Sequence, residues 1–420
     1  MKGEPSMAVD ERKCRFCGNP LRVSVADLGM SPVSNDNIKP ERLSSMEPFY
    51  PLHAYVCEQC WLVQLEQFQA ADDIFNDEYA YFSSFSKSWL EHARQYSLKV
   101  IDRFGLNQDS QVVEIASNDG YLLKNFKEKG IKILGVEPCV NVAEAAEKIG
   151  IPSLKKFFGV KTAEQMVGDG YQADLLVGNN VLAHVPDLND FVKGLKILLS
   201  SQGVITMEFP HLKKLIEFNH FDTIYHEHFS YFSLLTVERV FAEFGLTIFD
   251  VEEIPTHGGS LRIYARHDSD TSKPVHENVN VMRDQEVNAG LKDVSVYMRF
   301  AEQVRETKRK LLSFLIETKR RGKTIVGYGA PAKGNTLLNY CGIRNDFIDY
   351  TVDLSPHKQG LFLPGTHLPI FSPQKIKETK PDYVLILPWN LKDEIMTQMA
   401  HIREWGGQFV VPIPELQVYK

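Results

Sequence analysis

A short polar loop, flanked by two acidic residues, is the stretch of this sequence best suited to binding a small ligand. The loop runs from Ser117 to Gly120 after an apolar run that ends at Glu114, and the next apolar run ends at Glu137. A dinucleotide-binding loop carries three glycines so that backbone N–H groups can approach a pyrophosphate, but this loop contains Gly120 alone. Because the carboxylate of Glu114 would repel phosphate, the sequence favours S-adenosylmethionine (SAM), whose sulfonium and ammonium groups are cationic.

Glu137 ends the second strand of this unit, at a position where an acidic residue accepts hydrogen bonds from a ribose diol. An ordinary strand–helix–strand unit that binds no ligand is the alternative interpretation. The residues that we expect to bind the cofactor are Glu114, Ser117, Asn118, Gly120, Glu137 and Asn179.

Two C-x-x-C pairs near the N-terminus have the spacing of metal ligands. The four residues are Cys14, Cys17, Cys57 and Cys60, whereas Cys139 and Cys341 stand alone. Two intervening residues let both thiolates of a pair turn toward one tetrahedral ion. Redox dithiols, or two disulfides in an oxidising compartment, are the alternatives. The pattern predicts a structural zinc, because four thiolates leave no coordination position for water.

The consecutive residues Tyr225, His226, Glu227 and His228 could transfer protons. A metal site is one interpretation, although histidines two residues apart suit a strand and not the helical spacing of a zinc protease. A structural histidine pair beside aromatic residues is another. As an acid–base cluster, the segment supplies a base of near-neutral pKa, a carboxylate to orient it and a phenol. Its position after the last strand of the first sheet favours the acid–base interpretation.

Alternating strands and helices must position these groups. Strands are predicted at 112–114, 131–136, 174–177 and 204–209, with a helical pattern from residue 188. In a parallel sheet, ligands bind at the carboxyl ends of the strands. The polar residues at the carboxyl ends of the four strands are Glu114, Glu137, Asn179 and Glu208. We expect these side chains to converge, and Asn180, next in the chain, to face the substrate.

A second α/β unit starts at KTIVGYGAPAKGNTLLN. Its glycines, Lys333 and Asn335 lie where a phosphate would be cradled before a helix, although the spacing is not that of a P-loop. We therefore expect Lys333 and Asn335 to bind a phosphate-bearing substrate. Upstream, a Gly-Gly turn leads into an alternating strand, where His257 or Arg262 could meet an anionic substrate group. A plain hairpin is the equal alternative there.

An aromatic and serine-rich cluster at residues 79–84 immediately precedes the first α/β unit. Tyr79 and Tyr81 could belong to a lid over the cofactor cleft, or the cluster could pack a domain junction. The residues alone leave both interpretations open.

Composition narrows the function classes. A chain of 420 residues with 43% hydrophobic and 24% charged residues is typical of a soluble protein of two or three domains. A net charge of -7 argues against a nucleic-acid partner. Since no apolar run reaches membrane-spanning length and the N-terminus lacks a signal peptide, we expect no membrane partner and a cytoplasmic protein.

These signals predict an α/β protein of three parts. Residues 11–70 would form a zinc-binding module, and residues 71–255 a Rossmann-like class I methyltransferase domain with the aromatic cluster at its start. Residues 256–420 would form a second Rossmann-like domain that binds a phosphate-bearing substrate.

Seven motifs, together with the cysteine pairs, resemble the sugar C-methyltransferases of deoxysugar biosynthesis. The motifs are YAYFSSFS, EIASNDGYL, NNVLAHVPDL, YHEHFSYFS, HGGSLR, GYGAPAKGNTLLN and LPWN. The resemblance extends from Cys14 to Pro414, and Ala116 departs from it where many methyltransferases have glycine. It implies a SAM-dependent enzyme that acts on a dTDP- or GDP-linked 4-keto-deoxysugar, with residues 256–420 as the nucleotide-sugar-binding domain.

The resemblance also implies roles for particular residues. A base removes the proton next to the ketone, and the resulting enolate attacks the methyl group. By this analogy His228 is the base, Glu227 orients or assists it, and Tyr225 supports the developing oxyanion. Tyr79 or Tyr81 would line the same pocket, as part of a lid.

Two hypotheses from other classes remain. One is an NAD-dependent nucleotide-sugar oxidoreductase or epimerase, against which the acidic, glycine-poor loop argues. The other is a non-catalytic, zinc-bearing interaction protein. The sequence leaves open the sugar, the nucleotide carrier, the face of methyl addition and the oligomeric state.

Overall fold

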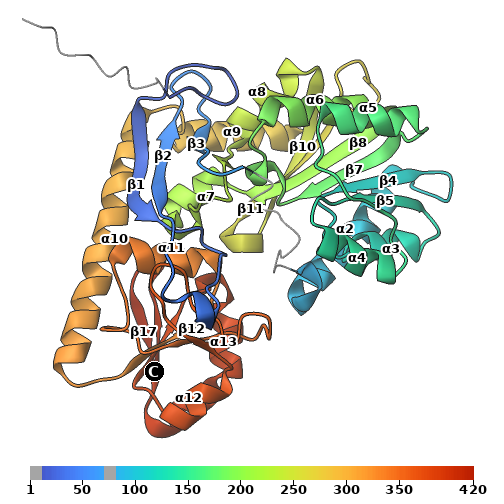
Figure 1. Ribbon diagram of the computed structural model, residues 1–420. Coiled ribbons are helices and arrows are strands. Elements are labelled where there is room, and N and C mark those ends of the chain that lie inside the picture. The colour runs from blue at the N-terminus through green and yellow to red at the C-terminus, as the bar shows by residue number, and fades with distance from the viewer. Residues whose placement is uncertain (1–11, 71–81) are drawn as a thin grey trace, which may run out of the picture. The chain divides into compact units, whose positions relative to one another are not determined.

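The computed structural model describes residues 12–70 and 82–420 (Figure 1). Contacts within the chain divide it into two units, each built from separate stretches of sequence. Unit 1 contains the described residues up to Val23, Val56–His211 and Phe229–Lys292, and unit 2 contains Ser24–Tyr55, Leu212–His228 and Asp293–Lys420. The two tyrosines of the predicted lid, Tyr79 and Tyr81, lie outside the described residues.

Unit 1 is built around a seven-stranded sheet with the order β10-β11-β8-β7-β4-β5-β6. The strands are β4 (Gln111–Ile115), β5 (Lys132–Val136), β6 (Ser153–Leu154), β7 (Ala173–Asn179), β8 (Leu199–Pro210), β10 (Leu246–Ile254) and β11 (Ser260–His267). Strands β4 to β8 run parallel, whereas β11 is antiparallel to both β8 and β10. The central strands β4 and β7 are buried along most of their length because helices cover both faces of the sheet.

The helices of unit 1 are α2 (Lys87–Phe104), α3 (Leu123–Lys127), α4 (Val140–Lys148), α5 (Val160–Gly168), α6 (Leu188–Leu198), α8 (Leu234–Glu243) and α9 (Glu277–Asn288). Figure 1 shows α2, α3 and α4 on one face of the sheet and α5, α6 and α8 on the other. Helix α2 begins where Ser86 accepts a hydrogen bond from the Trp89 N–H and ends at Gly105, whose φ of 63° suits glycine. Its buried face packs Tyr96 and Val100 against strand residues such as Val112.

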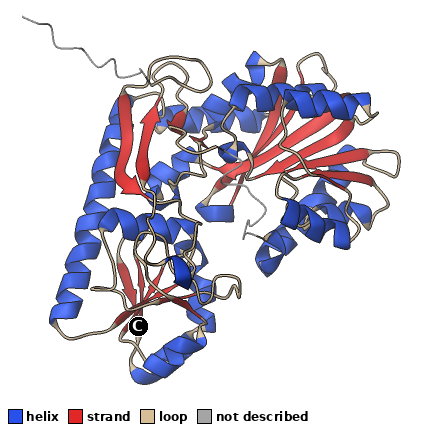
Figure 2. Ribbon diagram, in the orientation of Figure 1, coloured by secondary structure: helices blue, strands red, loops and turns tan. Residues whose placement is uncertain are grey.

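Unit 2 is built around a six-stranded sheet with the order β14-β13-β12-β15-β16-β17 (Figure 2). The strands are β12 (Ile325–Tyr328), β13 (Thr351–Val352), β14 (Ile370–Phe371), β15 (Tyr383–Ile386), β16 (Gln408–Val411) and β17 (Gln417–Tyr419). All pairs are parallel except β16 with β17. The helices are α7 (Leu212–Glu217), α10 (Val294–Arg320), α11 (Ala332–Cys341), α12 (Gln374–Thr379) and α13 (Lys392–Gln398).

The two sheets confirm the predicted fold class, with two α/β units in one chain. The predicted limit at residue 256 differs from the structure, because strand β11 completes the sheet of unit 1 and not that of unit 2. Its residues pair with β10 from Leu246 to Ile254 and with β8 from Ile205 to Pro210. The Gly-Gly turn before β11 therefore lies inside a hairpin that extends the first sheet.

The segment between the cysteine pairs also differs from the predicted limits. It forms strand β1 (Val23–Ser31), strand β2 (Tyr50–Val56) and a connecting loop. Residues 24–55 are grouped with unit 2 and not with the cysteines. Near the second pair, β3 (Val63–Leu65) is antiparallel to β9 (Ser230–Tyr231) within unit 1. None of the described helices is long and apolar enough to cross a membrane.

Candidate active site and metal centre

The four paired cysteines form a compact thiolate cluster in unit 1. The Sγ atoms of Cys14 and Cys60 lie 3.5 Å apart, as do those of Cys17 and Cys57, and all four lie within 4.8 Å of one another. A tetrahedral zinc ion with Zn–S bonds of about 2.3 Å would place its sulfurs about 3.8 Å apart. The residues thus fit the predicted ion. Over residues 12–70 and 82–420, this is the one group of three or more potential ligands that could hold a metal.

Hydrogen bonds orient the cluster and attach it to unit 1. The side-chain amide of Gln64 donates to the Cys14 Sγ at 3.1 Å. Arg15 donates to the carbonyl oxygens of Leu65 and Pro186 and lies over the ring of Phe229. Because all four ligands are thiolates and no position remains for water, the zinc is structural.

The loop after β4 turns sharply to present its backbone. Ala116 (φ 55°), Asn118 (φ 49°) and Gly120 (φ 78°) all adopt left-handed conformations. Ala116 therefore occupies a position where glycine would avoid a penalty of about 1 kcal/mol. Glu137, at the end of β5, closes the loop by accepting the N–H of Asn118 at 2.9 Å and that of Cys139 at 3.0 Å.

Three carboxyl groups gather in this loop. Burial raises the pKa of Glu114 well above its usual value, and the charges of Glu137 and Asp119 add to this effect. Burial also raises the pKa of Glu137, while the backbone N–H groups of Cys139 and Asn118 oppose the shift. Within the described chain, no lysine, arginine or histidine forms an ion pair with any of the three. A cationic ligand would favour the charged forms of these carboxyl groups.

Several polar atoms around the loop are buried without a hydrogen-bond partner in the described parts of the chain. They are Oγ of Ser117, Oδ1 of Asp119, both polar atoms of the Asn179 side chain and Oδ1 of Asn180. Strands β4 and β7 are neighbours, so Asn179 ends beside the loop that follows Glu114. Buried polar atoms are costly unless they are paired. These atoms therefore suit a polar ligand, and all six residues predicted to bind the cofactor lie at this edge of the sheet.

The described part of the predicted lid contacts the same loop. The N–H of Ser83 donates to Oδ1 of Asn118 at 2.8 Å, and that of Ser84 donates to Oδ2 of Asp119 at 3.1 Å. Residues 82–86 are thus connected to the cofactor loop. The side chains of Tyr79 and Tyr81 belong to the part that is not described, so their predicted role remains a prediction.

A polar cluster that the sequence did not reveal lies at the end of β8. Oε2 of Glu208 accepts Arg262 at 2.8 Å and lies 2.9 Å from Nε2 of His92, and Thr256 donates to Oε1 at 2.9 Å. Although burial acts in the opposite direction, His92 and Arg262 lower the pKa of Glu208 to about 2. Arg262 is only 4% exposed. Its guanidinium therefore neutralises Glu208, and it is not the free anion-binding group that the sequence predicted.

The aromatic residue Trp89 extends this cluster. Its ring stacks on His92 at 5.0 Å and on Tyr121 at 6.0 Å, and meets His257 edge-on at 5.3 Å. His257 itself adopts a left-handed conformation (φ 56°) in the turn before β11. Only three-dimensional pairing of α2 with the sheet could reveal this group, because its members are distant in the sequence.

Unit 2 contains the predicted acid–base segment, which forms a tight turn. The N–H of His228 donates to the carbonyl of Tyr225 at 2.9 Å. The Tyr225 hydroxyl lies 2.9 Å from Nε2 of His228, and Nδ1 of His228 lies 2.8 Å from the carbonyl oxygen of Thr223. Tyr225 and His228 therefore form a hydrogen-bonded pair.

The other two residues of the segment have different surroundings. His226 donates from Nε2 to the carbonyl of Pro51 at 3.2 Å, and its ring meets Tyr50 edge-on. Burial lowers its pKa, although hydrogen bonds to nearby backbone act in the opposite direction. The two histidines thus have separate partners, which favours neither the metal site nor the histidine pair.

Glu227 is a buried carboxyl group. Its two oxygens each lie 2.8 Å from Nδ2 of Asn35. Burial raises the pKa of Glu227 to about 7, while Asn35 and the charge of Lys358 act in the opposite direction. A carboxyl group with this pKa exchanges protons near neutrality.

The glycine-rich loop of unit 2 is occupied by protein partners. Gly329 (φ 91°) lies so close to Pro388 that a Cβ atom would approach it to 2.5 Å. Lys333, at the start of α11, donates to Oδ1 of Asn390 at 2.7 Å and lies 4.6 Å from the centre of the Trp389 ring. Asn335 donates to the carbonyl of Ser34 at 3.1 Å. Asn335, which was predicted to bind phosphate, is 1% exposed and instead anchors the segment that contains Ser34.

Lys333 has two further neighbours, Trp389 of the LPWN motif and Asp222, which the sequence did not single out. The Trp389 indole N–H donates to Oδ2 of Asp222 at 2.8 Å, and the His220 ring stacks on the indole at 4.2 Å. Burial raises the pKa of Asp222 to about 7, with Lys333 and Trp389 opposing it. Burial lowers the pKa of Lys333, and the charge of Asp222 opposes that shift. The LPWN motif therefore helps to position the lysine.

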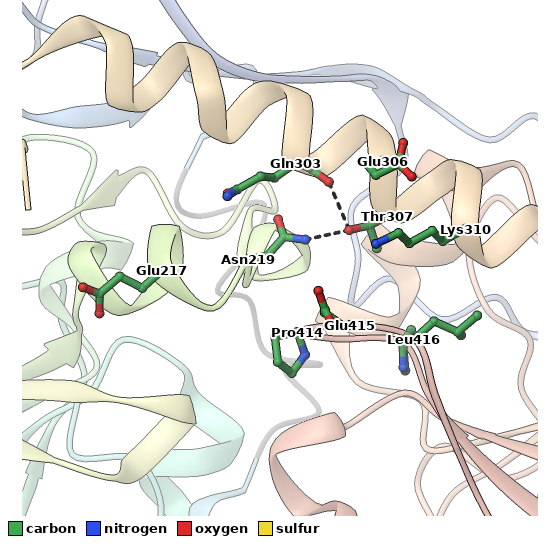
Figure 3. A pocket seen from close by; sticks show the side chains of 10 residues that line it. Glu217, Asn219, Gln303, Glu306, Thr307, Lys310, Pro414, Glu415 and Leu416 are labelled. Atoms are coloured by element: carbon green, nitrogen blue, oxygen red, sulfur yellow. Dashed lines mark hydrogen bonds between the residues drawn. The ribbon is translucent and has the colours of Figure 1, made fainter.

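A separate cavity of about 190 Å³ lies in unit 2 and contains none of the predicted site residues (Figure 3). At its wall, Asn219 donates to Oγ1 of Thr307 at 2.6 Å, and Thr307 donates to the carbonyl of Gln303 at 3.1 Å. Its remaining lining mixes carboxylates such as Glu306 with Lys310 and prolines. This mixture does not indicate a particular ligand.

Family models match nearly the whole chain. They are described as "Putative zinc binding domain" over residues 14–75, "Methyltransferase domain" over residues 89–251 and "C-methyltransferase C-terminal domain" over residues 255–414. Among curated proteins, C-methyltransferase NovU of Streptomyces niveus is 35% identical over 413 residues, which span 98% of this chain and 97% of NovU.

Solved structures with remote similarity include a SAM-dependent methyltransferase from Clostridium acetobutylicum, with 10% identity and a TM-score of 0.34. This match covers 42% of the present chain and 92% of the other. Magnesium protoporphyrin IX methyltransferase from Synechocystis with bound SAM gives 14% identity and a TM-score of 0.33, over 46% and 88% of the two chains.

The relation to NovU over the full length, the three consecutive domain matches and the four-cysteine cluster agree with the motif resemblance. These findings argue against the two alternative hypotheses, an NAD-dependent oxidoreductase and a non-catalytic interaction protein. The chain belongs to the C-methyltransferase family, as a SAM-dependent enzyme with a structural zinc.

Proposed function

We propose that this enzyme methylates a carbon atom next to the ketone of a nucleotide-linked 4-keto-deoxysugar. The hydrogen-bonded pair Tyr225 and His228 is the observation that carries the proposal. Methylation at carbon requires removal of a proton from that carbon, and a ketone acidifies its neighbouring C–H bonds. A histidine whose two nitrogens have defined partners is suited to this proton transfer.

The hydrogen bonds of His228 assign its tautomer. A carbonyl oxygen can only accept, so Nδ1 carries the hydrogen that reaches Thr223, and Nε2 of the neutral ring has a lone pair that can accept a hydrogen bond. This lone pair faces the Tyr225 hydroxyl. The pair can therefore take up one proton, either at Nε2 directly or through the phenol. This is the role that we assign to His228, with Tyr225 as its hydrogen-bonding partner.

The proposed reaction transfers one proton from the sugar and one methyl group to it. The C–H electron pair becomes the enolate, whose carbon forms a bond to the methyl group. When bound, SAM supplies a methyl group on a cationic sulfur, and the C–S bond breaks to give neutral S-adenosylhomocysteine. The proton from the sugar remains on the Tyr225 and His228 pair until solvent removes it. Glu227, next in the chain to His228, assists as a carboxylate that stabilises the positive charge gained there.

We assign the cofactor to the carboxyl edge of the unit 1 sheet, where the carboxyl groups of Glu114, Asp119 and Glu137 gather. Asn180 and His257 are proposed substrate contacts. Lys333 is proposed to meet the phosphates of the carrier, because it is a cation at the first turn of α11. Asn335 and Arg262 are left out of this set, since both side chains are almost fully buried and are bound by protein groups.

Two measurements test the proposal. Calorimetry with S-adenosylhomocysteine, and separately with dTDP and GDP, should give micromolar binding of the first and a preference between the two nucleotides. The second measurement is NMR of a dTDP-linked 4-keto-6-deoxyhexose in D2O without SAM. We expect the enzyme to exchange one hydrogen next to the ketone, and His228→Asn to abolish the exchange. Exchange at the wild-type rate in His228→Asn would contradict the assigned base.

A further inference from the structure

Glu227 is held by a side chain from a distant part of the sequence. Nδ2 of Asn35 lies 2.8 Å from Oε1 and 2.8 Å from Oε2, and both residues belong to unit 2. An amide nitrogen can only donate, so both carboxylate oxygens act as acceptors. Since Glu227 is 2% exposed, this contact replaces much of the hydration that the carboxylate has lost.

Asn35 lies in the loop between β1 and β2, and this loop is firmly anchored. The carbonyl of Ser34, one residue earlier, accepts the side-chain amide of Asn335 at 3.1 Å. Ile38, three residues later, exchanges backbone hydrogen bonds of 2.8 and 2.9 Å with Phe362. Two fixed points on either side of Asn35 therefore hold its backbone in place.

Helix α11 connects this loop to the turn that carries the acid–base residues. Oγ1 of Thr336 lies 3.4 Å from Oγ of Ser34 and 3.2 Å from the carbonyl oxygen of Ile224. Ile224 immediately precedes Tyr225. One buried threonine thus contacts the residue before Asn35 and the residue before the Tyr225–His228 turn, which fixes the two segments relative to each other.

Asn35 is the neutral donor that favours the charged form of Glu227. Lys358 is the charged group that faces it from another segment, and Tyr225, His226 and His228 are the titratable groups of its own turn. Burial favours the protonated form of Glu227, and Asn35 is the first of the groups that favour the carboxylate. Without Asn35, protonation would persist to a higher pH.

We propose that Asn35 is a positioning residue for Glu227, which it holds as an oriented carboxylate for the proton-transfer step. This inference rests on the proposed function, because Glu227 has a role in that function. It also gives the loop between the two cysteine pairs a part in the reaction that a zinc-binding module alone would not have. Asn35 itself need not touch the substrate.

The test compares wild-type enzyme with Asn35→Ala, Asn35→Asp and the matched control Asn37→Ala, a substitution in the same loop. Turnover of a dTDP-linked 4-keto-6-deoxyhexose is measured from about pH 6 to about pH 9.5. In Asn35→Ala we expect the acidic limb to move up by about one pH unit, so that turnover at pH 6.5 falls about tenfold. Turnover should recover to within about twofold at pH 9.5. Asn35→Asp should shift the limb further, because two carboxylates would face each other.

Thermal unfolding supplies a readout that needs no substrate. When a carboxyl group has a higher pKa in the folded than in the unfolded state, the folded protein becomes less stable as the pH rises between the two pKa values. In Asn35→Ala this fall in Tm should extend to a higher pH than in wild-type enzyme, whereas Asn37→Ala should follow the wild-type curve.

The outcomes separate this inference from the proposed function. Suppose that Glu227→Gln is inactive but the pH profile of Asn35→Ala keeps the wild-type shape, whether turnover is preserved or uniformly reduced. This result would overturn the positioning role of Asn35. Wild-type turnover in Glu227→Gln would instead refute the role of Glu227 in the proposed function. If the wild-type enzyme does not turn over the sugar, an unshifted Tm curve in Asn35→Ala overturns the positioning role alone.

Discussion

The hydroxyl of Tyr225 lies 2.9 Å from Nε2 of His228, and the two rings face each other with their centroids 4.0 Å apart. The turn at residues 225–228 brings these side chains together, and the carbonyl of Thr223 fixes the opposite nitrogen of the imidazole. In a pair so constrained, the Tyr225 hydroxyl can donate its hydrogen to the Nε2 lone pair of His228. This relationship leads to the first prediction.

Replacing His228 by Asn, or Tyr225 by Phe, should reduce turnover about 10²- to 10⁴-fold, because general acid–base groups contribute in that range. Binding of S-adenosylhomocysteine should remain within about twofold, since neither residue belongs to the cofactor loop. Steady-state kinetics and calorimetry check the two halves of this prediction. A variant that loses cofactor affinity in parallel with turnover would indicate a structural role for the pair.

Replacing Asn179 by Ala should weaken the binding of S-adenosylhomocysteine about tenfold or more. Both polar atoms of this buried side chain lack a partner in the described chain, so a ligand would supply their hydrogen bonds. Asn280→Ala, on the exposed part of α9, is the matched control and should bind like the wild type. Calorimetry measures both. Unchanged affinity in Asn179→Ala would remove Asn179 from the cofactor site.

Replacing Cys57 or Cys60 by Ser should abolish stoichiometric zinc binding and lower Tm, because the ion contributes folding free energy. Cys341→Ala, a buried cysteine outside the cluster, should keep one zinc ion per chain. Elemental analysis and thermal unfolding provide the measurements. A full zinc content in Cys57→Ser would mean that the ion lies elsewhere.

Stability should fall as the pH rises from about 4.5 to about 7, and two buried acids should cause part of this fall. Glu227 and Asp222 each have a pKa raised to about 7 by burial, above the values of the unfolded chain. Between these limits the folded protein binds more protons than the unfolded protein, so a rise in pH favours unfolding. Glu227→Gln and Asp222→Asn should each flatten the dependence of Tm on pH across this window. A slope equal to that of the wild type in both variants would show that these acids titrate normally.

The features of this protein that depend on local pattern could be predicted from its sequence. Alternation of apolar runs with helical periodicity predicted two α/β units, and both sheets are present. The C-x-x-C spacing predicted the thiolate cluster, and the residues after β4, β5 and β7 were expected at one edge of the sheet. These predictions succeed because period, turn chemistry and strand polarity are encoded within short stretches of chain.

The contacts between side chains that are distant in the sequence could not be predicted and are seen in the folded protein. Arg262 could have faced an anionic substrate, but the pairing of β11 with β8 places it against Glu208. Asn35 carries no motif, yet its loop packs beside α11 and reaches Glu227. A hydrogen bond between residues far apart in the chain depends on how whole segments pack. No local pattern records that packing, because burial and partner choice are properties of the folded chain.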